Sequence, residues 1–562
     1  MTHPDREPRL LLAAIDNQMP LPVQRPDAVM KLHRILFAFS LITASGPCVD
    51  EARAQATLDW VSSATGRGNA VLTDPNGFIY ISTGVFLHKY DLQGNVQWSR
   101  MLDSLGGYRD IANWMVFDPS GDIILTGGSS AFGNDFLTMK YDAAGNKLWE
   151  TFTSIGYEAF RVGTDAAGNS YVVGRTHSSL PDYVTAKYDP NGNEVWTKIY
   201  SGGVINRPYA LSVSPAGEVA VTGESNTANE YDIATVVYET DGTERWVRTH
   251  TSAIAGGGQD QGNCVALGPT GEVYVGGVSE NQPFDWDFTL IKYDATGQEL
   301  WVRDYDSPGP GFDSIDRMAL DSQGRIVVVG YMDFDMGIIK YDQDGNVLWM
   351  DRFDGGAIGG EEHVSEMIIS DDDSIYVTGE SAQNILTLKY DANGTLRWSE
   401  LYNIATTFGE QGFAIGLDSG GGIVVAGTHP AQALRYVEDQ TWTGLGDGLA
   451  GSGGAPVLTG HGSLSAGGAV TLTMMQSLKP ASYAMIIGLS HAGLPFLGGT
   501  LVPSPDLVLP VLSTGADGTS VLGANWPAGI PSGTHFYFQA WVFDPAGPLG
   551  FAASNGLVGT TN

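Results

Sequence analysis

The residues best suited to metal chemistry are pairs of aspartates two positions apart. Three such pairs lie near turn residues: Asp285 and Asp287, Asp333 and Asp335, and Asp371 and Asp373. Carboxylate oxygens on loops and strand ends are the ligands that Ca²⁺ prefers in proteins. None of the pairs has the twelve-residue spacing of an EF-hand. The pairs therefore predict calcium candidates, with solvated turn carboxylates as the alternative.

No other metal or cofactor is indicated. The ten histidines are scattered, without a His-x-His or His-Glu-x-x-His pattern, so no zinc site is predicted. The one local cluster, Glu361, Glu362 and His363 with Glu366, is typical of a polar loop. We predict no cofactor-binding residue.

Aromatic residues in two polar segments suit ligand binding. Phe284 and Trp286 lie in a segment where a plain turn would need neither ring, and Tyr231 follows Asn226 and Asn229. Aromatic and amide side chains together can stack on a sugar and hydrogen-bond to it. Tyr231, Phe284 and Trp286 therefore predict a ligand-binding face, unless each ring folds back over a sheet edge.

Catalysis leaves no recognisable signature. The chain has no G-x-S-x-G motif, and no Ser/His/Asp set can be assembled from it. A glycosidase needs only two carboxylates, and such a pair is indistinguishable among 63 Asp and Glu residues. We predict no catalytic residue, and the protein is more readily explained as a non-enzyme.

Charge excludes two classes of partner. The 562 residues include 29 Lys and Arg against 63 Asp and Glu, a net charge of −34. Nucleic acids and anionic membrane surfaces both select clustered cations. With 43% hydrophobic residues the chain is also too apolar to be disordered throughout.

The first 54 residues read as a targeting segment. Lys31 and Arg34 precede an apolar run over 35–44, and Ala52 and Ala54 are the small residues of a cleavage site. This layout predicts a secretory signal peptide cleaved after Ala54, with a buried helix as the alternative. The mature chain would then be secreted or at the cell surface, without a transmembrane anchor.

An internal repeat dominates residues 55–440. The block K-Y-D-x-x-G-x-x-x-W, or a close variant, starts at Lys89, Lys140, Lys187, Val237, Lys292, Lys340 and Lys389. Its tryptophans are 47 to 55 residues apart, and a D-x-x-G block falls between them. Each unit contains four short β-prone runs, as at 160–164, 170–175, 183–188 and 194–200. Such units are blades of a β-propeller.

The ends of the repeat predict a closed ring. A Trp60 strand precedes the first unit, while the last unit has only three strands, at 413–417, 423–427 and 433–436. The amino-terminal strand is therefore expected to complete the last blade, which removes free edges. We expect eight blades; seven is the alternative, because Trp60 and Trp98 are only 38 residues apart.

The repeated residues themselves favour architecture over function. A Trp at one place in every blade is expected to pack between neighbouring blades. The Asp of each D-x-x-G and K-Y-D block is expected to accept hydrogen bonds from turn N–H groups.

The repeat resembles the bacterial SBBP-type β-propeller repeat and is similar to the delta-60 repeat. The likeness rests on x-D-[FY]-x-x-x-K-Y-D, as in Asn134–Asp142 and Trp286–Asp294. It implies an extracytoplasmic propeller and no particular reaction. The repeat also has the general look of eight-bladed quinoprotein dehydrogenases. The chain lacks their vicinal cysteine pair and any insertion long enough to cover a quinone, which makes that alternative weaker.

Residues 441–562 form a different region. They contain five charged residues, against a strongly acidic repeat region. A Gly-rich linker followed by apolar runs, including 470–474, 483–489, 507–512 and 536–543, predicts a small β-sandwich. Segments 445–456 and 539–555 resemble a carboxy-terminal module of secreted planctomycete and myxobacterial proteins, whose role is unsettled.

We therefore expect an all-β protein, with an extension at 1–54, a propeller at 55–440 and a sandwich at 441–562. The variable second-to-third and fourth-to-first strand connections are expected to carry a ligand. The predicted function is a secreted or cell-surface binding or scaffold module for glycans or envelope proteins. The alternatives are a polysaccharide hydrolase or lyase, the quinoprotein-like dehydrogenase, and structural envelope material. A deep pocket with convergent acids and a His would favour an enzyme; a flat aromatic face would favour binding.

Overall fold

The computed structural model describes two compact units. The propeller unit is Leu58–Val437, and the C-terminal unit combines Met1–Thr57 with Glu438–Asn562. The described residues are 39–41, 56–63, 67–103, 110–129, 135–153, 155–227, 230–252, 258–307, 311–354, 361–403, 410–428, 432–438, 442–446, 448–451, 455–461, 464, 469–475, 481–515, 520–527, 530–531 and 533–561.

Strands of the propeller unit form four-stranded antiparallel sheets, and in all but one of the described sheets the four strands follow one another in the chain. The first four are sheet 1, β3 (Ala70–Thr73), β4 (Ile79–Ser82), β5 (Phe86–Tyr90) and β6 (Val96–Met101); sheet 2, β7 (Asp110–Phe117), β8 (Ile123–Ser129), β9 (Asp135–Tyr141) and β10 (Lys147–Thr153); sheet 3, β11 (Gly156–Thr164), β12 (Ser170–Thr176), β13 (Tyr183–Tyr188) and β14 (Glu194–Tyr200); and sheet 4, β15 (Ile205–Val213), β16 (Val219–Thr227), β17 (Glu230–Tyr238) and β18 (Glu244–His250).

Three further sheets repeat this pattern, and one differs. The three are sheet 5, β19 (Gln261–Leu267), β20 (Val273–Gln282), β21 (Asp285–Tyr293) and β22 (Glu299–Tyr305); sheet 6, β23 (Asp313–Leu320), β24 (Ile326–Met332), β25 (Asp335–Tyr341) and β26 (Val347–Phe353); and sheet 7, β27 (Glu362–Ile369), β28 (Ile375–Ser381), β29 (Asn384–Tyr390) and β30 (Leu396–Tyr402). Sheet 8 has the order β2-β33-β32-β31, from β31 (Gly412–Leu417), β32 (Ile423–Gly427), β33 (Gln432–Glu438) and the amino-terminal β2 (Ala56–Ser63).

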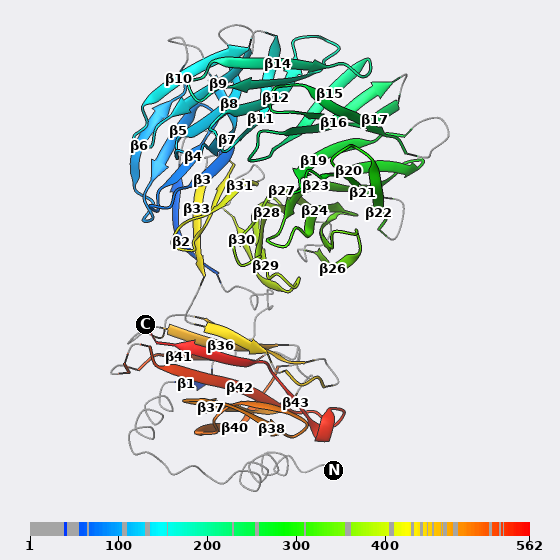
Figure 1. Cartoon of the computed structure of the whole chain (residues 1–562). Coiled ribbons are helices and arrows are strands. Elements are labelled where there is room, and N and C mark those ends of the chain that lie inside the picture. The colour runs from blue at the N-terminus through cyan, green and yellow to red at the C-terminus, as the bar shows by residue number, and fades with distance from the viewer. Residues whose placement is uncertain are drawn as a thin grey trace. The chain divides into compact units, whose positions relative to one another are not determined.

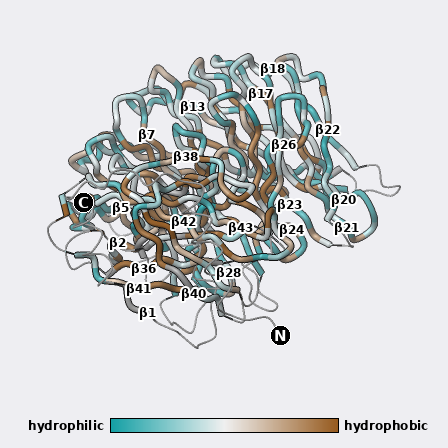
Figure 2. Tube along the Cα trace, turned by 90° about the horizontal axis from the view of Figure 1, so that it is seen from below, coloured by the Kyte–Doolittle hydropathy of each residue, from teal (hydrophilic) through white to brown (hydrophobic). Residues whose placement is uncertain are grey.

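The sheets are arranged as in a β-propeller (Figure 1). The first strand of each sheet lies innermost and contacts the first strand of the next sheet, and β31 of sheet 8 contacts β3 of sheet 1. Apolar side chains fill the space between neighbouring sheets; one core cluster, for example, joins Val329 and Ile338 of sheet 6 to Val377 and Leu388 of sheet 7. Figure 2 shows apolar residues along the strands and polar residues at many turns. The prediction of an all-β fold built from four-stranded antiparallel sheets is confirmed.

The repeated turns are held by their aspartates, as expected. In the first D-x-x-G block, Asp74 Oδ1 accepts the backbone N–H groups of Asn76 and Phe78, both at 2.9 Å. In the first K-Y-D block, Asp91 Oδ1 accepts those of Gln93 and Asn95. These bonds occupy the donors of a tight turn, so the aspartates are architectural.

The repeated tryptophan links each sheet to the next. Trp60 Nε1 on β2 donates to Leu92 O of sheet 1 at 2.9 Å, and its ring covers Gly94 so closely that a Cβ there would lie 2.7 Å away. Trp149 and Trp196 make the same contacts with the β13–β14 and β17–β18 turns. The expected packing of tryptophan between blades is confirmed, and it explains why glycine recurs in that turn.

Glu400 is a half-buried acid at the boundary of sheets 7 and 8. Its Oε1 is buried without a hydrogen-bond partner among the described residues, and its charge acts on Tyr436 of β33. Burial raises the pKa of Glu400 to about 7. Because the unfolded chain releases this proton near the ordinary pKa of 4.5, the folded state loses stability as pH rises from about 4.5 through 7.

The Glu400→Gln variant is therefore expected to be more stable than the wild type at pH 8, by about 2 kcal/mol, and equal to it at pH 4.5. Thermal denaturation at the two pH values checks this. A gain of the same size at both pH values would contradict an ionised Glu400 as the cause.

The C-terminal unit contains two facing sheets with one core. One sheet has the order β1-β41-β36-β35 and the other β34-β44-β42-β37-β40, with β43 paired to β42; β38 and β39 form a hairpin. Leu472 and Leu522 of the first sheet share a core cluster with Met485 and Phe538 of the second. The strands are β1 (Phe39–Leu41), β34 (Trp442–Gly446), β35 (Val457–His461), β36 (Ala469–Met475), β37 (Ser482–Gly488), β38 (His491–Phe496), β39 (Gly499–Pro503), β40 (Leu507–Ser513), β41 (Ser520–Asn525), β42 (His535–Phe543), β43 (Phe551–Ala553) and β44 (Gly556–Thr560).

Most of the predicted signal peptide lies outside the described residues. Within its apolar run, Phe39–Leu41 form β1 and pair antiparallel with β41. The signal peptide itself stays a prediction.

Candidate binding site

A cavity of about 850 Å³ lies among the innermost strands of the propeller unit. Its wall is contributed by sheets 1, 2, 3, 6, 7 and 8. It includes Thr83, Gly84 and Val85 of a second-to-third strand connection. The cavity thus lies toward the side of the longer, variable connections.

A repeated backbone irregularity shapes this wall. The pairing register of the innermost strand shifts at one equivalent place in sheets 2 to 8, for example between Ala159 and Arg161 in β11 and between Ile315 and Arg317 in β23. Such a bulge adds a residue and redirects the side chains beside it. The cavity is lined mainly by the residues at these bulges, including Asn113, Trp114, Phe160, Arg161, Arg317, Ser365 and Phe413.

Three arginines face the cavity. The Arg161 guanidinium lies 4.2 Å from the centre of the Trp114 ring, and its Nη1 donates to Phe160 O at 3.2 Å. Arg67 lies 3.5 Å above the ring of Phe413. Arg317 Nε is 3.3 Å from Glu366 Oε2 on β27. Cation–π contacts hold Arg67 and Arg161. The carboxylate of Glu366 and the nearby charge of Asp316 hold Arg317.

Arg161 lies close to a second cation, Arg317. Burial, together with the nearby charge of Arg317, lowers the pKa of Arg161 to about 10, although the charge of Glu366 opposes this. No ion pair of Arg161 with a carboxylate is present among the described residues. The one acid in the cavity wall, Glu158, accepts a hydrogen bond from Asn113 Nδ2 at 2.9 Å. A bound anion would supply the missing counter-charge.

Amide side chains brace the wall from sheet to sheet. Asn69 Nδ2 donates to Ala112 O at 2.8 Å, and Asn113 Nδ2 donates to Ala159 O at 2.9 Å. Gln411 Nε2 donates to Ser365 Oγ at 3.0 Å. Because each bond crosses to a neighbouring sheet, the cavity is built on rigid elements and is formed before any ligand arrives.

No sequence pattern indicated the cavity residues. They carry no motif of their own, since the residue type varies from unit to unit. They do share a position: Trp114, Arg161 and Arg317 lie four residues before the D-x-x-G blocks at Asp118, Asp165 and Asp321. Aligning the units and examining that column would have revealed them.

An aromatic row lies on sheets 5 to 7, and we define it as Trp286, Phe312, Tyr331, Phe334 and His363. Ring centroids are 5.9 Å apart for Trp286 and Phe312, and 6.1 Å apart for Phe312 and Tyr331. Tyr331 stacks on His363 at 5.2 Å and meets Phe334 edge-on at 6.2 Å. Trp286 thus lies at one end of a row that contains four further rings.

The predicted ligand-face residues lie in two places. Trp286 belongs to the aromatic row, and Phe284, at the tip of the β20–β21 hairpin, is 80% exposed. Tyr231 lies at the start of β17 in sheet 4, where the Arg207 guanidinium is 6.0 Å from its ring centre. Among the described residues, no ring contact joins Tyr231 to the aromatic row. The prediction for these three residues remains untested.

Two of the three predicted calcium pairs are engaged by cations. Arg352 forms ion pairs with Asp335 and, at 3.7 Å, with Asp333. Asp373 accepts the backbone N–H and the hydroxyl of Ser322 and lies 3.5 Å from Arg325 Nη2, while Asp371 is exposed.

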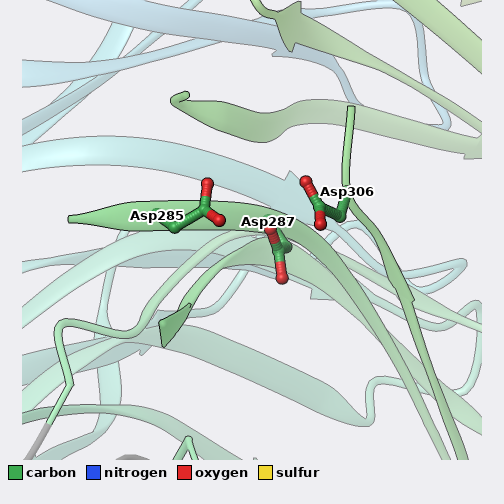
Figure 3. A group of neighbouring side chains, drawn as sticks. All are labelled: Asp285, Asp287 and Asp306. Carbon is green, nitrogen blue, oxygen red and sulfur yellow. The ribbon is translucent and has the colours of Figure 1, made fainter. Parts of the chain in front are cut away.

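The third pair gains a partner. Asp285 and Asp287 lie beside Asp306, with one oxygen of each within 4.8 Å of the others (Figure 3). Burial, with the charges of Asp306, Asp285 and Asp304, raises the pKa of Asp287 to about 6, although Asn281 opposes this. In the described part of the chain this is the only cluster of three potential metal ligands.

Comparison with known proteins adds little on function. No family model and no curated protein matches the chain. Among solved structures, Sqt1 from Chaetomium thermophilum has 14% identity and a TM-score of 0.48, over 68% of this chain and 98% of that one. The Pseudomonas aeruginosa periplasmic gluconolactonase PpgL has 14% identity and a TM-score of 0.38, over 72% and 99%. The WD40 β-propeller domain of Doa1 has 10% identity and a TM-score of 0.38, over 68% and 97%. Likeness at this level bears on neither ligand nor activity.

Proposed function

We propose that the protein is a non-catalytic binding module whose central cavity takes an anionic saccharide. The observation that carries this proposal is the presence of three arginines and three aromatic rings, Trp114, Phe160 and Phe413, around one cavity of about 850 Å³. A guanidinium binds a carboxylate through two parallel hydrogen bonds, and aromatic rings pack on the apolar face of a sugar. A uronic acid offers both features.

The charge pattern supports this choice. The chain as a whole carries −34, yet the cavity wall holds three arginines and one glutamate. The negative field of the whole protein does not attract anions at long range. The three inward-facing arginines are therefore expected to act at short range, on a ligand inside the cavity.

The cavity does not resemble a hydrolytic centre. A glycosidase requires two carboxylates facing each other across the substrate. The described wall contains only Glu158, which is hydrogen-bonded to Asn113, and no histidine. This composition favours binding over the hydrolase or lyase alternative.

The scaffold is proposed to be a closed ring of eight blades. Contacts of β31 with β3, the place of β2 in sheet 8 and the bond from Trp60 to Leu92 support closure. In a closed ring the cavity has a continuous wall, so its side chains stay at fixed positions relative to one another.

An envelope protein is a second candidate ligand. The aromatic row supports it, because Phe334 is 56% and Phe312 46% exposed, and Phe284 nearby in sheet 5 is 80% exposed. Large exposed aromatic side chains are typical of protein contact sites.

We propose that the protein acts outside the cytoplasm, either at the cell surface or as a secreted protein. The support is the segment at 31–54, with its two cations, apolar run and small residues. In the described part of the chain, no helix has the length and apolarity needed to cross a bilayer.

Isothermal titration calorimetry of the full chain tests the proposal, with neutral and uronic-acid oligosaccharides as probes. We expect the acidic oligosaccharide to bind in a salt-sensitive manner. The Arg161→Met variant should weaken it by about tenfold or more, since a hydrogen bond to a charged group contributes about 1.5–3 kcal/mol. The affinity of Arg161→Lys should lie between those of the wild type and Arg161→Met, because lysine keeps the charge but lacks the planar fork of hydrogen-bond donors.

Arg303→Met provides the matched control. Arg303 lies on the outer strand β22 and binds Gly345 O at 2.8 Å, away from the cavity wall. Its affinity should equal that of the wild type. The proposal fails if neither class of oligosaccharide binds, or if Arg161→Met and Arg303→Met have the same effect.

A further inference from the structure

Asp285, Asp287 and Asp306 form an acidic cluster at one end of sheet 5. Asp285 and Asp287 lie on β21, and Asp306 directly follows β22. One oxygen from each lies within 4.8 Å of the other two. Figure 3 shows the three carboxylates turned toward one another. Asp287 is only 6% and Asp285 9% exposed, while Asp306 is exposed to solvent.

One carboxylate oxygen in this cluster is left without a partner. Asp287 Oδ2 accepts a hydrogen bond from Asn281 Nδ2 at 2.8 Å, and Asp285 Oδ1 accepts the Gly311 N–H at 3.0 Å. Asp287 Oδ1 is buried and has no hydrogen-bond partner among the residues that the structure describes. A buried, unpaired carboxylate oxygen destabilises the folded state, so a ligand is expected to satisfy it.

The equivalent aspartates of sheets 2, 3 and 6 each have a side-chain partner. Asp335 in sheet 6 pairs with Arg352, Asp135 in sheet 2 lies 2.8 Å from His177 Nε2, and Asp182 in sheet 3 accepts from Asn206 Nδ2 at 2.7 Å. In sheet 5 the residue that corresponds to Arg352 by strand register is Asp304. Sheet 5 therefore has an acid at the position where sheet 6 has the cation Arg352.

In the described part of the chain, no cationic side chain compensates for these charges. Among the described residues, Asp285, Asp287 and Asp306 take part in no ion pair, and the charges that act on Asp287 are all negative. Like charges this close repel one another, and a bound cation removes that repulsion.

We propose that Asp285, Asp287 and Asp306 bind one Ca²⁺ ion. Calcium takes six to eight oxygen ligands in a flexible geometry, so three carboxylates and water can complete its shell. Magnesium demands a stricter octahedron and gives up its water reluctantly, so it should bind more weakly. The exposed Asp306 provides the route of entry, and the ion ties the start of β21 to the segment after β22.

Calorimetric titration of the full chain with CaCl₂ tests this site. We expect one Ca²⁺ ion per chain, with Mg²⁺ at least tenfold weaker. Asp306→Asn, an exposed and nearly isosteric change, should weaken Ca²⁺ binding by tenfold or more without unfolding the protein. Asp287→Asn should abolish it.

Asp354→Asn is the matched control. Asp354 follows β26 in sheet 6 as Asp306 follows β22 in sheet 5, and it faces no comparable cluster among the described residues. This variant should bind Ca²⁺ as the wild type does. Absence of Ca²⁺ binding to the wild type, or equal binding by Asp306→Asn and Asp354→Asn, would overturn the proposal.

Discussion

Replacing Trp398 with alanine is expected to cost about 3–5 kcal/mol of folding free energy, the range for a large buried aromatic residue. Trp398 lies on β30 and is only 1% exposed. Its ring lies between Tyr376 of its own sheet and Tyr436 of sheet 8, with centroids 6.3 and 6.5 Å away. Truncation therefore opens a cavity at the junction of two sheets, where neither backbone can collapse to fill it.

Thermal denaturation of the full chain measures this effect. A loss of this size should lower the melting midpoint of the propeller unit by roughly 5 °C or more. Trp98→Ala is the control, because Trp98 has the same place in sheet 1 but remains half-exposed. We expect its destabilisation to be less than half as large. Equal losses would mean that the repeated tryptophan acts through its turn contacts rather than through burial.

Strand positions in the propeller unit are predictable because hairpin chemistry is local. In sheet 3 the turns at Asp165–Gly168 and Asp189–Gly192 mark strand ends directly, and the observed β13 and β14 match the expected runs. The expected first strand at 160–164 is too short, since β11 begins at Gly156. The bulge between Ala159 and Arg161 breaks the alternation of polar and apolar residues there, so no local pattern indicates the earlier start.

The residues of the cavity and of the acidic cluster were harder to predict from the sequence, because they come together only in the folded protein. Arg161 and Arg317 are 156 positions apart in sequence and become neighbours only when the innermost strands of several sheets converge. Asp306 joins Asp285 and Asp287 through the pairing of β21 with β22, a register that the aspartate spacing alone does not indicate. Repetition predicts a scaffold well; the positions at which the repeats differ carry the function and have no shared motif.

Replacing Arg435 with methionine is expected to destabilise the protein by about 3–5 kcal/mol, as for loss of one partner of a buried ion pair. Arg435 on β33 is 7% exposed, and its Nε lies 2.6 Å from Asp418 Oδ2. The Asp418 side chain is fully buried, so its charge would be left without a cation. Asp418→Asn combined with Arg435→Met should recover part of the loss, because it removes that uncompensated charge. Thermal denaturation of both variants checks this order.

Arg435 also bears on how the ring closes, because it forms an ion pair with Asp59 of β2. Asp59→Asn should cost at most about 1 kcal/mol, since the Asp59 side chain is 40% exposed. Hydrogen exchange separates the two roles of Arg435. If β2 completes sheet 8, Arg435→Met should speed amide exchange in both β2 and β33, although they lie more than 370 residues apart in the chain. Faster exchange in β33 with an unchanged β2 would contradict a shared sheet, because strands bonded in one ladder lose protection together.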